Sequence, residues 1–333
     1  MQYRKLGKTD LLISEIGYGT WQFANDSNCW VGSTKKESEQ SLLYAIDNGL
    51  NFIDTARSYG DGLAEKWIGE IIQKRSDKKI IVASKILPKN WQWPARSGTN
   101  IQDVFPKKHI INQVNESLKE LDIESLDIMM FHVWLDEWAS EEEWKEVIQE
   151  LTKAGKVKYW GISTNNHEST NCIKACETGL ISVVETIFNI FYQEPIDTLL
   201  PFLKTNNIGL IARVPLDEGG LTGNINSNSK FPEGDFRNSY FSQDRLVELE
   251  KRINKLKRII DKSNEIKSLV EIALKFILHF DEVSTVIPGM RRLNHVKENI
   301  SISMKSPLSE QLIKELLTHS WNRNFYGNNP WEE

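Results

Sequence analysis

The sequence predicts an α/β protein in which eight parallel strands close into a (β/α)8 TIM barrel, preceded by an N-terminal β-hairpin. Short apolar segments alternate with amphipathic helical segments along the chain, as expected for parallel strands covered by helices. At 333 residues the chain has the length of one such barrel, so we expect residues 1–333 to form a single domain. The turn Gly17-Tyr18-Gly19 after the first strand lacks the third glycine of a dinucleotide-binding open sheet, which favours the closed barrel.

The order of the segments follows this plan. Residues 2–16 contain two short strand-like segments around a Gly-Lys-Thr-Asp turn and are expected to cover the barrel floor. Runs of β-branched and apolar residues predict the strands, and apolar residues with a period near 3.6 predict the helices. The eight strands are predicted at residues 17–20, 51–54, 80–84, 126–131, 157–161, 183–187, 208–212 and 283–287. Six connecting helices are predicted at residues 37–48, 63–73, 109–121, 141–153, 168–179 and 196–205.

Two connections are too long for plain strand-to-helix loops, residues 86–107 and 214–242. Both follow strands, so both are expected to lie over the C-terminal mouth, where barrel enzymes keep their active sites. The tail, residues 321–333, is polar and aromatic, and Gly327 and Pro330 interrupt any helix there. It is expected to form either a third mouth loop or a frayed end.

Composition excludes several classes of function. The net charge is −5, with both signs interspersed, and the most basic stretch, residues 251–262, has helical spacing, so we expect a solvated helix face and no nucleic-acid partner. No apolar run is long enough to span a bilayer, and the N-terminus lacks the apolar core of a signal peptide. We therefore expect a cytoplasmic protein with no membrane partner. Cys29, Cys172 and Cys176 do not make a disulfide framework, and we expect packing thiols.

Ionisable and polar residues stand where the predicted strands end, which is where the loops of a barrel begin. Asp54 ends the second strand, Tyr59 follows it, Lys85 ends the third strand, and His132 follows the fourth. Buried ionisable groups are unfavourable unless they are paired. These side chains, together with Ser163, Asn165, Glu185 and Asn189 after later strands, are therefore expected to converge on one cavity.

One chemistry that fits these residues is hydride transfer coupled to proton transfer. Reduction of a carbonyl needs an acid that protonates the oxygen as hydride reaches the carbon. A lysine ammonium about 4 Å from a phenol stabilises the phenolate by roughly 4 kcal/mol at an effective dielectric of about 20, so Lys85 is expected to lower the pKa of Tyr59 from about 10 to about 7. Asp54 would hold Lys85 in place, and His132 would donate a hydrogen bond to the substrate oxygen.

A second chemistry is a metal site. Asp54, His132 and Glu185 offer hard and borderline ligands for a divalent ion, as in sugar isomerases or lyases. Lys85 in the same cavity would repel such an ion, which favours hydride transfer and no metal. The residues alone leave both alternatives open.

The sequence also resembles the aldo-keto reductase superfamily from residue 1 to about residue 304. The resemblance begins with Tyr-Arg-Lys-Leu-Gly-Lys-Thr at 3–9 and is most specific at 51–60, where Asn-Phe-Ile-Asp-Thr-Ala is followed by Tyr-Gly. The pairs Ser84-Lys85 and Phe131-His132 match the two further catalytic strand ends. Segment 215–223 resembles the loop that covers the cofactor pyrophosphate, and segment 287–299 resembles the part that binds the adenosine phosphate.

This resemblance implies a barrel that reduces aldehydes and ketones with NADPH and binds no metal. It implies that Tyr59 is the general acid, that Lys85 and Asp54 adjust its acidity, and that His132 orients the carbonyl. Arg291, or Arg292 in its place, would contact the 2′-phosphate of the cofactor, which favours NADPH over NADH. The residues implied in cofactor binding are Thr20, Trp21, Asp54, Ser163, Thr164, Asn165, Glu185, Arg213, Pro215, Leu216, Gly219, Leu221, Gly223, Gly289, Arg291, Arg292, His295, Glu298 and Asn299.

Two positions depart from the family's pattern. Glu185 stands where the family commonly has a glutamine that hydrogen-bonds the carboxamide of the cofactor, and an ionised carboxylate accepts hydrogen bonds but cannot donate them. Thr164 replaces a frequent asparagine. The effect of Glu185 on cofactor binding is left open.

Tryptophans gather on the segments that are expected to face the mouth: Trp21, Trp30, Trp91, Trp93 and Trp134. Two more, in the tail, could join them. Rigid aromatic walls predict a flat, apolar pocket for a ring-shaped substrate, either aromatic or sugar.

The β subunits of potassium channels, which have a different class of function, also resemble this fold and keep the same four catalytic-site residues. The expected partner is a small-molecule carbonyl substrate. The alternative function is that of a regulatory subunit that binds a nicotinamide cofactor with little turnover. The physiological substrate, the preferred direction and the oligomeric state are not predicted.

Overall fold

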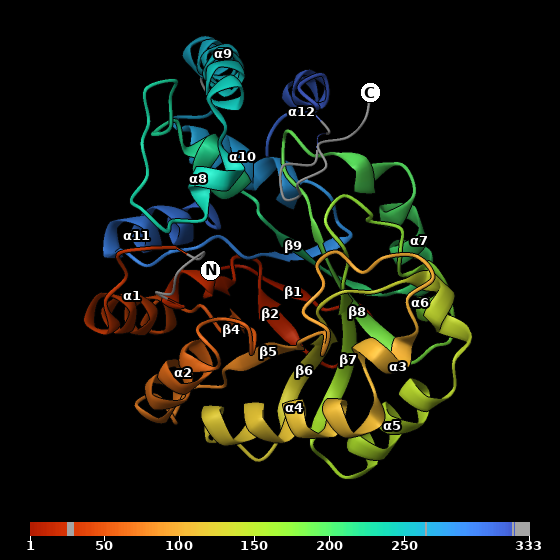
Figure 1. Cartoon of the computed structure of the whole chain (residues 1–333). Helices are drawn as coiled ribbons and strands as arrows, with labels where there is room; N and C mark the ends of the chain where they lie inside the picture. Colours follow the sequence, from red (N-terminus) through yellow and green to blue (C-terminus); the bar gives the residue numbers. More distant parts are fainter. Residues whose placement is uncertain (25–29, 264, 322, 324–333) are drawn as a thin grey trace.

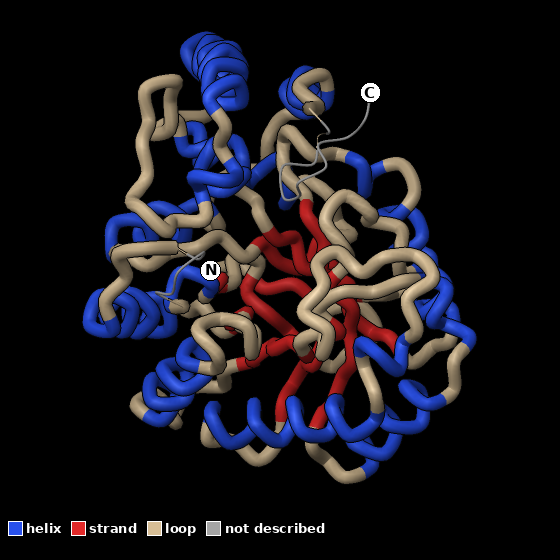
Figure 2. The backbone as a smooth tube through the Cα atoms, viewed as in Figure 1, coloured by secondary structure: helices blue, strands red, loops and turns tan. Residues whose placement is uncertain are grey.

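The computed structural model describes residues 1–24, 30–263, 265–321 and 323. Eight parallel strands run side by side in chain order from β3 to β10 and form the centre of the molecule, with helices around them (Figures 1 and 2). The two ends of this sheet meet where Gly17 N donates to Val286 O at 2.8 Å and Gly19 N donates to Pro288 O at 3.2 Å. The predicted (β/α)8 architecture is confirmed.

The strand positions agree with the sequence prediction to within two residues at each end. The barrel strands are β3 (Tyr18–Gly19), β4 (Phe52–Asp54), β5 (Ile81–Ile86), β6 (Leu126–Phe131), β7 (Val157–Ser163), β8 (Ile181–Ile187), β9 (Gly209–Arg213) and β10 (Val283–Val286). Most of these residues are buried, because one face of each strand packs inside the barrel and the other packs under the helices.

Inward-facing positions recur at every second residue of each strand, as the pleat requires. The apolar members of this series form the core inside the barrel. They include Phe52 of β4, Ile81 and Ala83 of β5, and Ile128 and Met130 of β6. The next inward position of each of these strands, at its C-terminal end, is polar. The barrel therefore has an apolar floor and a polar top.

The N-terminal hairpin covers the floor, as predicted. Strands β1 (Tyr3–Lys5) and β2 (Leu12–Ser14) pair antiparallel. Leu6, Leu11 and Ile13 are at most 2% exposed and belong to the same core as the inward residues of the barrel. Burial of these three side chains contributes roughly 5 kcal/mol or more to holding the hairpin in place.

Helices cover the outside of the barrel. Those between β3 and β9 are α1 (Lys35–Asp47), α2 (Leu63–Gln73), α3 (Ile101–Val104), α4 (Lys107–Leu121), α5 (Glu143–Lys153), α6 (Ile173–Glu177) and α7 (Leu199–Asn206). Beyond β9 are α8 (Arg237–Tyr240), α9 (Gln243–Lys262), α10 (Leu269–Leu278), α11 (Leu293–Ile302) and α12 (Glu310–Leu317). Side-chain caps define several starts: the Thr34 and Ser242 side chains accept from backbone N–H groups in the first turns of α1 and α9.

One helix is shorter than predicted. The sequence predicts a helix at residues 168–179, but α6 is confined to Ile173–Glu177. His167 has a φ of 59°, in the left-handed region, and the Glu168 side chain accepts hydrogen bonds from Asn165 and Asn171. These side-chain bonds compete with helical ones, so the chain turns here before the helix begins.

The cysteines and the basic stretch agree with the sequence analysis. Cys172 and Cys176 are buried free thiols in the core around α6, and Cys29 lies outside the described residues. Residues 251–262 form the C-terminal part of α9, whose Leu256 is buried while its lysines are exposed. This stretch therefore includes the solvated face of a helix whose apolar side is buried in the hydrophobic core and contacts α10.

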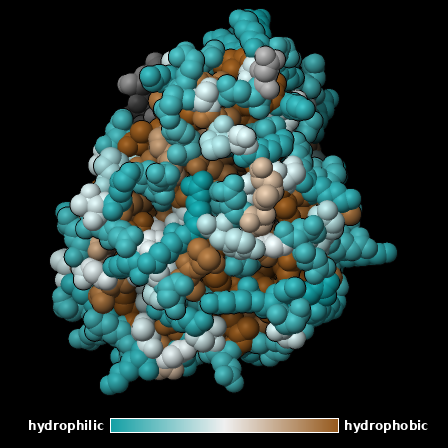
Figure 3. Space-filling view, turned by 180° about the vertical axis from the view of Figure 1, so that it is seen from behind, coloured by the Kyte–Doolittle hydropathy of each residue, from teal (hydrophilic) through white to brown (hydrophobic). Residues whose placement is uncertain are grey.

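The face turned away in Figure 1 carries many hydrophilic side chains with separate hydrophobic patches between them (Figure 3). Among the described residues, no helix combines the length and the apolar character that crossing a membrane requires.

The hairpin generates a stability prediction at Gly7. This residue has a φ of +52°, and a Cβ there would lie 2.2 Å from Gly209 N and 2.6 Å from Ile208 C. Gly7→Ala is expected to lower the free energy of unfolding by about 3 kcal/mol, because left-handed strain adds to a clash with rigid backbone.

The matched control is Gly155→Ala, where φ is +72° but no atom lies within 4 Å of the added Cβ. This variant should lose only about 1 kcal/mol. Urea denaturation measures the free energy of unfolding of both variants. Equal losses of stability in the two variants would show that the contact with β9 does not constrain the hairpin.

Candidate active site

A cavity of about 1180 Å³ opens at the C-terminal ends of the strands. That volume exceeds what one small substrate needs, so the cavity can hold a large ligand beside a smaller one. Most of the residues predicted from the sequence line it. They are Thr20, Trp21, Asp54, Tyr59, His132, Ser163, Thr164, Asn165, Glu185, Arg213, Pro215, Leu216, Gly219, Gly289, Arg291, Arg292, His295, Glu298 and Asn299.

The centre of the site is a buried ion pair. Lys85 Nζ donates to Asp54 Oδ1 at 2.6 Å and Oδ2 at 2.8 Å, and to Thr55 O at 3.0 Å. Lys85 is fully buried and does not line the cavity, whereas Asp54 does. Both residues continue the inward-facing series of their strands, and β4 and β5 are neighbours. A buried ammonium needs such partners, because its desolvation would otherwise be very unfavourable.

Glu185 joins this pair from β8. Its Oε2 lies 3.4 Å from Lys85 Nζ, and its Oε1 accepts a hydrogen bond from Ser163 Oγ at 3.1 Å. Ser163 and Glu185 are register partners on adjacent strands, which explains the contact. Arg213 Nε lies 3.9 Å from the same Oε1. The sequence-based metal alternative would need Asp54 and Glu185 as ligands, but the Lys85 ammonium already lies between these two carboxylates.

Burial and charge act together on these groups. Desolvation raises the pKa of Asp54 well above its ordinary value, and Glu185 raises it further, while Lys85 opposes both. The pKa of Lys85 is raised, because attraction to Asp54 and Glu185 outweighs its desolvation. Lys85 therefore stays charged, and the two carboxylates compete for the same ammonium.

Tyr59 stands at the edge of this group, in the turn before α2. The Lys85 Nζ lies 5.5 Å from the centroid of the Tyr59 ring. The expectation that Lys85 lowers the pKa of Tyr59 to about 7 is wrong for the free protein. Desolvation raises the pKa of Tyr59 above its ordinary value, and Asp54 and Glu185 offset the effect of Lys85. Tyr59 is therefore a protonated phenol at neutral pH, which is the form that an acid needs.

His132 faces Tyr59 across the cavity. Their ring centroids are 6.3 Å apart, and the Trp93 ring approaches His132 edge-on at 5.6 Å. Desolvation, then Lys85 and Arg213, hold the pKa of His132 well below its ordinary value. The imidazole is therefore neutral at neutral pH and can donate one hydrogen bond.

Aromatic side chains wall one part of the cavity, namely Trp21, Trp91, Trp93 and Phe236. Trp21 and Phe236 are in contact, with ring centroids 4.8 Å apart. Trp134 does not belong to this wall, contrary to the sequence prediction. It is fully buried and packs against Phe131, Trp138 and Trp144 in the core. Of the tail tryptophans, Trp321 packs on Phe191 outside the cavity lining, and Trp331 lies outside the described residues.

Segment 214–242 crosses the cavity and is fastened to its other side. Asp235 Oδ2 accepts a hydrogen bond from Val31 N at 3.2 Å, and the Arg237 guanidinium lies 4.3 Å from the Trp30 ring centroid. The loop 86–107 is held in a similar way, because Asn165 Oδ1 accepts from Ala95 N at 3.3 Å. Both long loops therefore lie over the mouth, as predicted.

Two residues of segment 214–242 that were predicted to bind the cofactor, Leu221 and Gly223, are not among the residues that line the cavity. Leu221 is fully buried in the hydrophobic core, and Gly223, with a φ of +76°, ends the 3₁₀ turn formed by residues Asp217–Thr222. Their neighbours Pro215, Leu216 and Gly219 do line the cavity. The sequence motif is therefore split between the cavity wall and the core beneath it.

The far end of the cavity is basic. Arg291 Nη1 donates to Val31 O at 2.8 Å, so this guanidinium ties segment 31–33 to the strand end. Arg292 is exposed, precedes the first turn of α11 and lines the cavity. No side chain caps the N-terminus of α11. An exposed cation beside free helix N–H groups favours an anion at this end.

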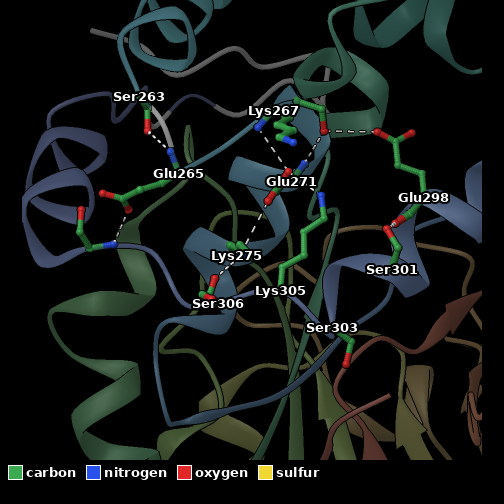
Figure 4. A network of polar contacts seen from close by, with 12 residues as sticks. Ser263, Glu265, Lys267, Glu271, Lys275, Glu298, Ser301, Ser303, Lys305 and Ser306 are labelled. Carbon is green, nitrogen blue, oxygen red and sulfur yellow. Dashed lines mark hydrogen bonds and ion pairs between the residues drawn. The ribbon is translucent and has the colours of Figure 1, made fainter.

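The helices behind this end are joined by a network of charged and polar groups (Figure 4). Glu271 of α10 is buried and accepts from Lys305 Nζ at 2.6 Å and from Lys267 N at 3.3 Å. Glu298 of α11 accepts from Ser268 Oγ at 3.3 Å. The network fastens α10 to α11 and to the segment that follows, and so fixes where Glu298 and the buried Asn299 meet the cavity.

The sequence profile of the aldo/keto reductase family matches residues 15–320. The chain belongs to the aldo-keto reductase family. It is 28% identical to the aldo-keto reductase YhdN of Bacillus subtilis over 88% of this chain and 86% of that protein. It is also 28% identical to a probable voltage-gated potassium channel subunit beta of Arabidopsis thaliana over 94% of each chain. The structure of the glycerol dehydrogenase AKR11B4 from Gluconobacter oxydans superposes with a TM-score of 0.77, at 22% identity, over 96% of this chain and 97% of that one.

Membership of the aldo-keto reductase family confirms the resemblance seen in the sequence, and members of this family are oxidoreductases. Several residues that line the cavity were not predicted from the sequence, among them Val31, Asn166, Phe236 and Arg237. All of them lie outside the strands, where no periodicity shows which side chains turn inward. The one local signal was the length of segment 214–242, which placed it over the mouth.

Proposed function

We propose that this protein reduces an aldehyde or a ketone to the alcohol with NADPH, and that Tyr59 is the general acid. The observation that carries the proposal is the buried pair of Lys85 and Asp54, next to a protonated Tyr59 in a cavity that extends to Arg292. A protonated phenol beside a neutral imidazole gives two hydrogen-bond donors for one carbonyl oxygen, as an oxyanion-stabilising site requires.

The cavity suits a nicotinamide dinucleotide. Its lining extends from polar groups at the strand ends, including Ser163 and Glu185, to the basic end at Arg292. When bound, the cofactor supplies or accepts the hydride. Ser163, Glu185 and Arg213 would hold the nicotinamide end, and the residues from Gly289 to Asn299 would hold the adenosine end. Arg292 and the α11 N-terminus fit a 2′-phosphate, which favours NADPH over NADH.

The proposed roles follow from the geometry. Tyr59 donates its proton to the carbonyl oxygen as negative charge develops there. Lys85 then stabilises the phenolate, and Asp54 keeps the Lys85 ammonium in place. His132 donates a hydrogen bond that orients the carbonyl. The small-molecule carbonyl substrate would enter beside Trp93. The expectations of a cytoplasmic location and of no nucleic-acid partner stay predictions.

A regulatory subunit that binds nicotinamide cofactor with little turnover is a second candidate, because a relative named as a potassium channel β subunit matches almost the whole chain. Tight retention of NADPH together with very slow turnover on every carbonyl tested would favour this function over that of a reductase.

The first prediction concerns the acid. Tyr59→Phe is expected to lower kcat about 100-fold or more, since the proton donor is removed, while the dissociation constant of NADPH changes little. Steady-state kinetics and fluorescence titration measure the two quantities. Turnover at the wild-type rate would remove Tyr59 from the mechanism.

The second prediction separates the two arginines. Arg292→Ala is expected to weaken NADPH binding about tenfold or more and to leave NADH binding unchanged, because it removes one charge-assisted contact with the 2′-phosphate. Arg291→Ala should weaken both nucleotides, since it releases segment 31–33. Equal losses of NADPH and NADH binding in Arg292→Ala would refute the phosphate assignment.

The third prediction concerns the aromatic wall and a ring-shaped substrate. Trp93→Ala is expected to raise KM for an aromatic aldehyde about threefold to tenfold, as expected for the loss of one ring contact, and to leave KM for a short aliphatic aldehyde nearly unchanged. Trp91→Ala is the comparison variant and should raise KM for the aromatic aldehyde less, because Trp91 of the same wall is 65% exposed against 39% for Trp93. Unchanged KM values for both aldehydes in Trp93→Ala would exclude Trp93 from the substrate site.

A further inference from the structure

Glu185 has one carboxylate oxygen that is held by an ion pair alone. The residue is 1% exposed, yet it lines the cavity. Its Oε1 accepts from Ser163, but its Oε2 has no hydrogen-bond partner among the described residues, and the Lys85 ammonium lies 3.4 Å away. Buried polar atoms without partners are rare and need an explanation. Because Glu185 lines the cavity, this oxygen is available to accept a hydrogen bond from a group bound there.

Glu185 belongs to a group of two cations and two carboxyl groups. Lys85 and Arg213 are the cations that face it, from β5 and β9, and Asp54 of β4 carries the other carboxyl group. Replacing Glu185 by glutamine removes a carboxylate from this group and makes the site more positive.

Two further titratable groups at the inner end of the cavity, His132 and Tyr59, add no charge there. Desolvation lowers the pKa of His132 and raises the pKa of Tyr59, so both side chains are neutral at neutral pH. The positive character of the inner end of the cavity therefore depends on whether residue 185 is a carboxylate or a neutral amide.

The nicotinamide ring must lie at this inner end, because hydride has to reach the carbon whose oxygen Tyr59 protonates. That ring carries a positive charge when it is oxidised and none when it is reduced. We propose that Glu185 selects the oxidation state of the bound nicotinamide: it holds the cationic oxidised ring more tightly than a glutamine would, and it thereby favours reduction of the carbonyl at equilibrium on the enzyme. This inference rests on the proposed function and specifies its direction.

The expected size follows from electrostatics. At an effective dielectric of about 20, a unit charge about 10 Å away changes the affinity for a cation on the order of tenfold. The affinity for the neutral reduced ring should change far less. Binding and oxidation of the cofactor are linked equilibria. A residue that tightens binding of the oxidised cofactor relative to the reduced one therefore shifts the equilibrium on the enzyme toward the oxidised cofactor by the same factor.

The test compares two dissociation constants in the wild type and in Glu185→Gln, measured by titration with NADP⁺ and with NADPH at one pH. The ratio of the NADP⁺ constant to the NADPH constant is expected to rise about tenfold in the variant. Glu185→Asp, which keeps the charge, should retain most of the wild-type ratio. Glu185→Ala is a second neutral variant and should shift the ratio in the same direction if the glutamine variant does not fold.

The matched control is Glu65→Gln. Glu65 is also fully buried, and it accepts a hydrogen bond at 2.6 Å from the Oγ of Ser84, the residue that precedes Lys85. Unlike Glu185, it does not line the cavity. Its substitution should leave the ratio unchanged. If the neutral variants at Glu185 bind both nucleotides with the wild-type ratio, this inference fails and the proposed reductase stands. If the wild type binds neither nucleotide, both proposals fail.

Discussion

The buried ion pair between Lys85 and Asp54 is the interaction on which the site depends. An ammonium and a carboxylate are taken out of water only when their geometry compensates for desolvation. Here the geometry is provided by two neighbouring strands, whose next inward positions bring Nζ within 2.8 Å of both carboxylate oxygens. Loss of Lys85 would remove the cation that the two buried carboxyl groups share, and loss of Asp54 would leave the ammonium Glu185 as its carboxylate partner, at the longer distance of 3.4 Å. The barrel and the pair are therefore mutually dependent, because strand pairing positions both charges.

Burial around this pair controls protonation in two opposite ways. It keeps the proton on Tyr59, since phenolate would be poorly solvated there, and it keeps His132 neutral, since imidazolium would be poorly solvated next to two cations. Both side chains can therefore donate hydrogen bonds at neutral pH. Glu185 enters the same electrostatic group from β8 and raises the pKa of Asp54.

The strands and the loops divide the remaining tasks. Rigid strand ends hold the groups that must lie within a few tenths of an ångström of their partners. The loops hold the groups that shape the cavity, and side-chain contacts fasten them across it, as when Asp235 accepts from Val31 N or Asn165 accepts from Ala95 N. Arg291 acts in the same manner at the far end, where it fastens segment 31–33.

The sequence by itself determined the barrel, its strand ends and the polar residues at its top. An inward position recurs at every second residue of a strand, so the positions after the apolar residues Phe52 and Ala83 are the polar residues Asp54 and Lys85. Only the tertiary structure decided what long-range neighbours impose: that Trp134 packs in the core, that Leu221 turns away from the cavity, and that two carboxylates and burial keep the pKa of Tyr59 high. Periodicity reports which face of a strand a residue occupies. It does not report loop geometry, or the distances that set electrostatic energies.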